Sequence, residues 1–506
     1  MKSGFLEVPL YQSKVAARHI MRGVIRRARV GSTEPGGTLI YLPVQNKVEG
    51  SKPDLLRLDS REYFMRLIST LRNKVKIGLF IIIAISTTLG GCLLGSSQLV
   101  IINGTISGLT GSGLVLQDNG GDNLAVPAGS TSFSFVTALS NGSSYNVSVL
   151  TQPSAPLQMC TVSNGTGITG TAVNPITITC AATELVYVTN GASNNVSAYT
   201  INPPTGALTS IGTFPAGTTP NSVAVVPAGN FAYVTNGGSN SISGYSIDPT
   251  TGDLTSIGTF AAGTGPDSVA LNPAGNFAYV ANAGSNSISA YSIDATSGAL
   301  TSIGTFAAGT GPNSVTVNPA GNYVYVANGG SNNISAYSIN TATGVLASIG
   351  TFAAGADPVS VTVVPTRNYA YVANTGSSDI SAYSINPTSG VLTSIGTFAA
   401  GTAPTPIAVD PSGNFAYTAS SSNSVSAYSI DAATGTLANI GTFATGGISP
   451  VSVTVDPSDS YAYVTNGGSN TVSAFTLNTA TGVLTNAGMF MAGTTPGAIA
   501  VTPVPQ

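Results

Sequence analysis

The hydrophobic and polar positions of this chain repeat with a fixed period. A tyrosine recurs every 46 residues, at Tyr187, Tyr233, Tyr279, Tyr325, Tyr371, Tyr417 and Tyr463. Between these tyrosines, short runs of valine, isoleucine, threonine and tyrosine alternate with clusters of glycine, asparagine, serine and proline, which is the pattern of strands and tight turns. Strand-built repeats with a period in the forties are typical of propeller blades, because one four-stranded sheet cannot bury both faces without neighbours.

Each full repeat divides into four expected strands, for example residues 268–271, 277–282, 287–293 and 300–306. The first repeat begins at its second strand, residues 185–190, and the chain ends with a first strand that has no partner, residues 498–501. Pairing these two segments completes seven blades and removes two open sheet edges. We therefore predict an all-β chain in which residues 183–506 form a seven-bladed β-propeller closed by the C-terminal strand.

A second, smaller domain is predicted before the propeller. Residues 99–182 alternate with the two-residue period of half-buried strands and suggest a small β-sandwich. Cys160 and Cys180 are the only cysteines after Cys92, and in an exported chain we expect them to form a disulfide. Closing that loop would contribute roughly 3 kcal/mol. A metal site is disfavoured, because no histidine accompanies the two cysteines.

The N-terminal part divides into residues 1–64, a basic extension; 65–92, a signal peptide; and 93–98, a tether. After Met65 come four basic residues and then an apolar run, residues 77–85, which is too short to span a bilayer as a stable helix. We interpret residues 1–64 as sequence upstream of a true start at Met65; the alternative is a basic cytoplasmic arm.

Residues 89–92, Leu-Gly-Gly-Cys, resemble the lipobox of bacterial lipoproteins. The resemblance implies that Cys92 becomes the lipidated N-terminus and binds the chain to a membrane without a spanning helix. It places the protein outside the cytoplasm, at the outer membrane, in the periplasm or on the cell surface. The alternatives are a plain secretory signal and a single anchor helix.

Charge narrows the possible functions. From Cys92 onward there are thirteen acidic residues and one basic residue, Arg367, with no histidine or lysine. Such a chain cannot neutralise phosphates along a nucleic acid, so we exclude nucleic-acid binding. Because proton-transferring groups are scarce and the acids are scattered, we predict no catalytic residue, metal site or cofactor.

The repeated tetrapeptide reads Tyr-Val-Thr/Ala-Asn in six of seven repeats, and residues 417–420 depart as Tyr-Thr-Ala-Ser. From Glu184 onward the chain resembles the YVTN-type β-propellers of bacterial and archaeal surface proteins, which are related in fold to lactonase propellers. Together with the near-identity of the blades, this favours a lipid-anchored binding, adhesive or structural scaffold with a surface protein or glycan as its ligand. The alternative is a lactonase-like hydrolase of the 6-phosphogluconolactonase type.

A single binding site requires breaks in the repeat, since residues common to all blades serve the scaffold. In the sixth repeat the turn between the second and third strands is one residue shorter, and the loop that leads to the next blade is one residue longer; both lie on the same face. We predict a neutral to mildly acidic recognition surface there, around the channel mouth; the alternative is drift in exposed loops. The candidate residues are Asp267, Asp357, Asp379, Ser420, Ser421, Ser422, Asn423, Gly446 and Gly447.

Overall fold

The computed structural model describes residues 29–31, 39–41, 98–170 and 175–503. Its contacts divide the chain into two units, residues 1–97 and 98–506. In the first unit, Arg29–Gly31 (β1) pairs antiparallel with Leu39–Tyr41 (β2). The predicted signal peptide with Cys92 lies outside the described residues. None of the described helices is long and apolar enough to cross a membrane.

The predicted β-sandwich is present in the second unit as two four-stranded sheets, in the strand orders β6-β3-β10-β8 and β5-β4-β7-β9. Phe135 of one sheet and Leu116 of the other belong to one buried apolar cluster, as the two-residue alternation predicts. The strands are β3 (Leu99–Ser107), β4 (Leu114–Asp118), β5 (Asp122–Val126), β6 (Ser132–Ser140), β7 (Ser144–Thr151), β8 (Gln158–Ser163), β9 (Thr166–Ile168) and β10 (Ile176–Ala182).

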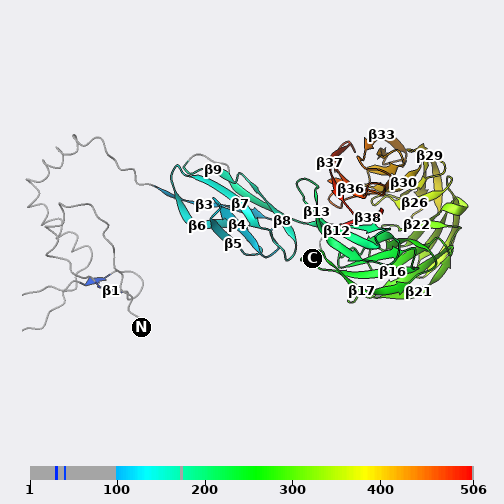
Figure 1. The fold of residues 1–506 in the computed structure, drawn as a ribbon, viewed down its shortest axis with the longest axis horizontal. Helices are drawn as coiled ribbons and strands as arrows, with labels where there is room; N and C mark the ends of the chain where they lie inside the picture. Colours follow the sequence, from blue (N-terminus) through cyan, green and yellow to red (C-terminus); the bar gives the residue numbers. More distant parts are fainter. Residues whose placement is uncertain (1–28, 32–38, 42–97, 171–174, 504–506) are drawn as a thin grey trace, which may run out of the picture. The chain divides into compact units, whose positions relative to one another are not determined.

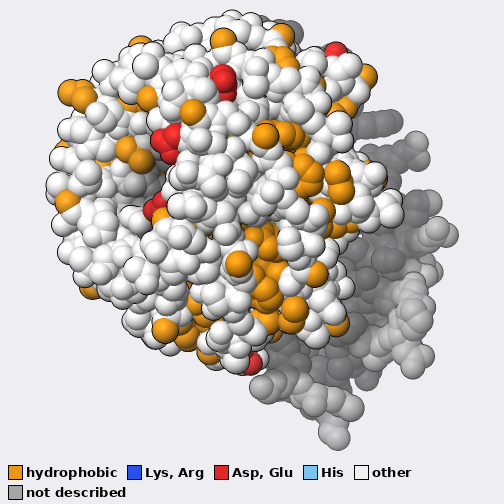
Figure 2. All heavy atoms as spheres, turned by 90° about the vertical axis from the view of Figure 1, so that its right-hand side faces the viewer, with side chains coloured by type: hydrophobic (Ala, Val, Ile, Leu, Met, Phe, Trp, Pro, Cys, Tyr) orange, Lys and Arg blue, Asp and Glu red, His pale blue; other side chains and the backbone are white. Residues whose placement is uncertain are grey.

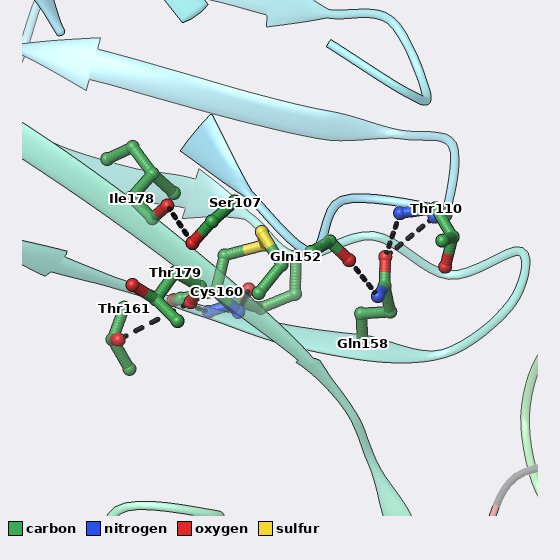
Figure 3. The surroundings of a disulfide bond; sticks show 11 residues. Ser107, Thr110, Gln152, Gln158, Cys160, Thr161, Ile178 and Thr179 are labelled. Carbon is green, nitrogen blue, oxygen red and sulfur yellow. Dashed lines mark hydrogen bonds between the residues drawn. A yellow bond between two sulfur atoms is a disulfide. The ribbon is translucent and has the colours of Figure 1, made fainter. Parts of the chain in front are cut away.

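The expected disulfide joins Cys160 of β8 to Cys180 of β10, which lie directly opposite each other. Around it, two glutamine side chains bind backbone groups (Figure 3). Gln152 accepts from the Cys160 N–H at 2.7 Å, and Gln158 accepts from the Thr110 N–H at 2.8 Å. The covalent bond and these hydrogen bonds together tie β8 to the rest of the sandwich.

The propeller contains seven four-stranded antiparallel sheets. Blade 1 is β38-β11-β12-β13, and blades 2 to 7 each contain four consecutive strands, from β14–β17 to β34–β37. The innermost strands are β14 (Pro220–Val225), β18 (Pro266–Leu271), β22 (Pro312–Val317), β26 (Pro358–Val363), β30 (Pro404–Val409), β34 (Pro450–Val455) and β38 (Pro496–Pro503). The second strands are β11 (Glu184–Asn190), β15 (Phe231–Asn236), β19 (Phe277–Asn282), β23 (Tyr323–Asn328), β27 (Tyr369–Asn374), β31 (Phe415–Ser420) and β35 (Tyr461–Asn466).

The two outer strands complete each blade. The third strands are β12 (Asn195–Ile201), β16 (Ser241–Ile247), β20 (Ser287–Ile293), β24 (Asn333–Ile339), β28 (Asp379–Ile385), β32 (Ser424–Ile430) and β36 (Thr471–Leu477). The outermost are β13 (Leu208–Pro215), β17 (Leu254–Ala261), β21 (Leu300–Ala307), β25 (Leu346–Ala353), β29 (Leu392–Ala399), β33 (Leu437–Ala444) and β37 (Leu484–Met491). A 3-10 turn, Gly329–Ser331 (η1), follows β23.

The last strand closes the ring as predicted. β38 pairs antiparallel with β11, with Val501 opposite Val186 and Ile499 opposite Val188. In Figure 1 the red end of the chain lies within the green sheet that starts the propeller. The closing strand leaves no inner edge of blade 1 available for pairing with another chain.

Two sets of tyrosine hydroxyls join neighbouring blades. In the second strands, Tyr233 donates to the Gly298 carbonyl of the next blade at 2.7 Å, and Tyr463 of blade 7 donates to Gly206 of blade 1 at 3.0 Å. In the third strands, Tyr245 donates back to the Pro215 carbonyl at 2.6 Å. The repeated tyrosines are therefore blade-packing groups, as expected for residues present in every repeat.

Candidate functional site at the mouth of the central channel

The innermost strands surround a hollow of about 860 Å³, to which all seven blades contribute lining residues. It opens on the face where the loop between blades meets the turn between the second and third strands. Hydrogen bonds join these two loops; for example, Gly237 N–H donates to the Thr219 carbonyl at 2.9 Å. The hollow is the channel mouth of the sequence-based prediction.

One position of the repeat makes this mouth asymmetric. Every innermost strand begins with proline, and in six of the seven blades the next residue lines the hollow; in blade 6 that residue, Thr405, does not, and Pro406 lines it instead. In blades 2 to 4 this residue is polar, and these three residues form the polar arc: Asn221, Asp267 and Asn313. Blades 5 to 7 supply branched or cyclic apolar groups to the lining instead, and these form the apolar arc: Val359, Pro406 and Val451.

Asp267 is the titratable group in the lining of the hollow. The Asn221 amide donates to one of its carboxylate oxygens at 2.9 Å. Burial raises the pKa of Asp267 above its ordinary value, and the hydrogen bond from Asn221 offsets part of that rise. A carboxylate that is partly desolvated and also oriented by a neighbouring amide is a suitable general base.

Asn313, in the blade after that of Asp267, has amide hydrogens that can donate to a ligand. Within the described part of the chain, the Asn313 amide makes one long bond, 3.5 Å, to the Pro358 carbonyl. Ser268, which follows Asp267, accepts the Val315 N–H at 3.2 Å and thereby joins two innermost strands. The polar arc thus combines a base with an amide donor, and a hydrogen bond joins the innermost strands that carry them.

The structure places the remaining predicted residues around this face but outside the lining of the hollow. Asp357 lies in the loop before β26, and Asp379 begins β28 and accepts from the Asn374 amide at 2.7 Å. The turn with Ser421 and Ser422 lies between β31 and β32, and the loop with Gly446 and Gly447 lies between β33 and β34. The structure brings only Asp267, of the predicted set, to the hollow.

Within that set, the altered loops of blades 6 and 7 are connected to each other. Asn423 accepts the Ser449 N–H at 2.9 Å, as Asn240 accepts the Gly265 N–H in an ordinary blade. Ser420 lies at the end of β31 and contacts Ser422 at 2.7 Å. A recognition role for these loops stays a prediction.

The polar arc was only partly found from the sequence. Asn221 and Asn313 were missed because they were not compared with Asp267 at the same position of the repeat. Reading the residue after each repeated proline across the seven blades would have shown them. In the described part of the chain, no group of three or more histidine, cysteine or acidic side chains could hold a metal ion.

Arg367, the one cation after Cys92, lies far from this chemistry in the turn between β26 and β27. That turn belongs to the opposite face. Its guanidinium donates to the Gly413 carbonyl and, at 3.0 Å, to the Asn414 side chain in the next blade. Figure 2 likewise shows a surface that is mostly uncharged, with a few scattered acidic side chains. The mouth therefore has no cation to hold an anionic substrate.

Comparisons with known proteins identify relatives of the propeller. A family described as "Lactonase, 7-bladed beta-propeller" matches residues 178–317, 304–408 and 393–501. No curated protein matches the sequence. A candidate 6-phosphogluconolactonase from Bacteroides uniformis is 20% identical with a TM-score of 0.59, over 63% of this chain and 99% of that one. The periplasmic gluconolactonase of Pseudomonas aeruginosa is 17% identical with a TM-score of 0.58, over 64% and 100% of the two chains.

At these identities the solved structures establish a shared fold, while the family match concerns the sequence itself. The family match contradicts the prediction that the chain is mainly a binding, adhesive or structural scaffold, and it favours the alternative, a lactonase-like hydrolase. The prediction was wrong because it equated few proton-transferring residues with no chemistry. One partly desolvated carboxylate in a concave site can serve as a base.

Proposed function

Because this chain belongs to the lactonase family of seven-bladed β-propellers, we propose that it hydrolyses an uncharged lactone at the channel mouth. The observation that carries the proposal is the position of Asp267, the titratable residue lining the hollow, with its carboxylate bonded to the Asn221 amide and with Asn313 at the matching position of the next blade. Hydrolysis of a cyclic ester needs a base for water and a donor for the carbonyl oxygen. The polar arc supplies both.

In the proposed reaction, Asp267 accepts a proton from a water molecule while the water oxygen attacks the lactone carbonyl. The Asn313 amide donates to the oxygen that gains negative charge. The tetrahedral intermediate collapses with cleavage of the ring C–O bond, and protonated Asp267 returns its proton to the leaving alkoxide. The product is one open-chain hydroxy acid, so no atoms other than those of water are added.

The charge of the site selects among lactones. Phosphorylated sugar lactones carry a dianion, which binding sites ordinarily pair with arginine, lysine or a metal. The one cation after Cys92, Arg367, is hydrogen-bonded on the other face. We therefore expect an uncharged lactone as the substrate. The name 6-phosphogluconolactonase, which some structural relatives carry, refers to a phosphorylated lactone instead.

The test is lactone hydrolysis by the full-length chain, followed in a pH-stat with the uncatalysed rate subtracted. Wild type should hydrolyse glucono-δ-lactone and should not prefer its 6-phosphate, and Asp267→Asn should lose about 100-fold or more in kcat/KM. Asp431→Asn, which removes an exposed carboxylate from the turn between β32 and β33 on the opposite face and leaves the residue type that blades 4 and 5 carry there, is the matched control and should retain activity. No turnover of any lactone by wild type would refute the proposal.

We also propose that the enzyme is exported and anchored by a lipid on Cys92. The support is the sequence of residues 65–92, with its basic start, short apolar core and Leu-Gly-Gly-Cys end. A disulfide between Cys160 and Cys180 agrees with an oxidising compartment. Mass spectrometry of the mature N-terminus tests the start site and the lipid together; an unmodified chain beginning at Met1 would refute this proposal.

A further inference from the structure

The wall opposite the proposed base is apolar, and it continues outward onto the surface. Val359, Pro406 and Val451 line the hollow on blades 5 to 7, facing the polar arc of blades 2 to 4. Val451 is 37% exposed, and Ile448, in the loop before β34, is 58% exposed. Exposed apolar side chains mark a binding surface where they adjoin one another, so the relation between these two decides the matter.

Ile448 and Val451 pack against neighbouring residues of one turn, and these two side chains are called the strip below. A Cβ atom added at Gly467 would lie 2.9 Å from the Val451 side chain, and one at Gly468 would lie 3.0 Å from that of Ile448. The two side chains therefore cover adjacent glycines of the turn between β35 and β36. A path of apolar groups runs from the hollow over the rim of blade 7.

Compared with the other blades, Ile448 is exceptional, and Val451 has an aliphatic counterpart in Val359 of blade 5. The position of Ile448 is threonine in most blades, such as Thr218 and Thr264, and the position of Val451 is polar in the three blades of the polar arc. Blade 7 has branched aliphatic groups at both.

From this geometry, and resting on the proposed function, we propose that the substrate is a lactone with an aliphatic chain. The ring lies against Asp267 in the polar arc, and the chain extends across the hollow along Val451 to Ile448. This arrangement is stabilised because it removes apolar surface of the chain and of the strip from water. Against the polar arc, a chain without hydroxyl groups would form no hydrogen bonds. The chain thereby fixes which face of the carbonyl meets the base.

The test compares δ-valerolactone, which has no side chain, with δ-decalactone, which has five further carbons. About half-burial of those carbons on the strip gives roughly a 10- to 30-fold preference in kcat/KM for the longer lactone. The double variant Ile448→Thr and Val451→Asn restores residues that other blades carry, so it should fold normally. It should lose the preference while its kcat/KM for δ-valerolactone changes less than about twofold.

The matched control is Val483→Thr, which replaces a valine that is also 37% exposed but lies in the turn before β37 on the opposite face. It should keep the chain-length preference. Equal kcat/KM for the two lactones in wild type, or a preference that survives in the double variant, would overturn the inference while leaving lactone hydrolysis intact. Turnover of neither lactone nor of glucono-δ-lactone would instead overturn the proposed function, and the inference with it.

Discussion

The stability of the closing blade should depend on pH through one glutamate. Glu184 begins β11 and lies opposite Pro503 of β38. Burial, and to a smaller extent the neighbouring Asp456 carboxylate, raise the pKa of Glu184 from its ordinary 4.5 to about 8. The folded protein therefore favours the protonated form of Glu184, whereas the unfolded chain releases that proton near pH 4.5.

The sign and the size of the effect follow from linkage. Because the pKa of Glu184 is raised in the folded state, its contribution to the free energy of unfolding is complete below pH 4.5. That contribution is lost as the pH rises through 8, at about 1.4 kcal/mol per pH unit. Between pH 5 and pH 8 this amounts to an upper limit of about 4 kcal/mol. Because Glu184 is partly accessible to solvent, we expect a loss of about 2–4 kcal/mol.

Glu184→Gln keeps the size and the hydrogen-bonding capacity of the side chain but cannot ionise. The free energy of unfolding of the variant relative to wild type should therefore rise by about 2–4 kcal/mol between pH 5 and pH 8. Urea unfolding followed by circular dichroism measures it at the two pH values. The same difference at both would refute the reasoning.

Asp294→Asn is the opposite control for this experiment. Asp294 is fully exposed, and the Ser297 N–H donates to it at 2.8 Å, so turn hydrogen bonds lower the pKa of Asp294. Neutralising it removes a stabilising carboxylate, and the variant should gain nothing relative to wild type as the pH rises. A gain in both variants would indicate a general effect of net charge and not the burial of Glu184.

Three further predictions concern the site and the ring. Because burial raises the pKa of Asp267, the acid limb of the profile of kcat/KM against pH should have its midpoint above the ordinary aspartate value near 3.8. The limb should vanish in Asp267→Asn, and an unchanged limb would contradict the role of Asp267 as base. Phe475 occupies the place that tyrosine has in the third strands of the other blades. Phe475→Tyr should stabilise the propeller by about 1 kcal/mol and raise its Tm, because the new hydroxyl can donate to the Ala444 carbonyl as Tyr428 does to Ala399. A lower Tm would show that the hydroxyl does not fit. Ending the chain after Thr495 removes β38 and leaves β11 as an exposed sheet edge. The shortened protein should have a lower Tm and should associate, which light scattering detects. A monomer of unchanged Tm would contradict closure of the ring by β38.

Much of the fold could be predicted from the sequence because each blade repeats the same local signals. The expected strands 277–282 and 287–293 match β19 and β20 residue for residue, since turn residues bound them on both sides. Closure by the C-terminal strand was predictable because a strand without a partner stood at each end of the repeats. In the sandwich, β9 escaped prediction, because its three residues, Thr166–Ile168, are too short for a periodic pattern.

The candidate site was harder to predict because its properties depend on which blades face each other. Asp267 was among the predicted residues as one of three acids on the same face, but its partial burial and its bond to Asn221 arise only when neighbouring innermost strands meet. Glu184 gave no signal at all. Its proximity to Asp456, far away in sequence, is a consequence of ring closure, which brings blade 7 against blade 1.

The near-identity of the blades explains how such a scaffold can hold a one-sided site. Side chains shared by all blades, such as the tyrosines that join them, give sevenfold similar surroundings and cannot orient a single carbonyl group. A single orientation requires polar and apolar residues to be grouped on opposite sides of the ring. The lining of the hollow has this grouping, with Asn221, Asp267 and Asn313 on one side and Val359, Pro406 and Val451 on the other. Had polar and apolar residues alternated around the ring, a lactone could bind in several rotations, and few of them would place its carbonyl beside the base. The grouping therefore converts a symmetric ring into a site with one productive orientation.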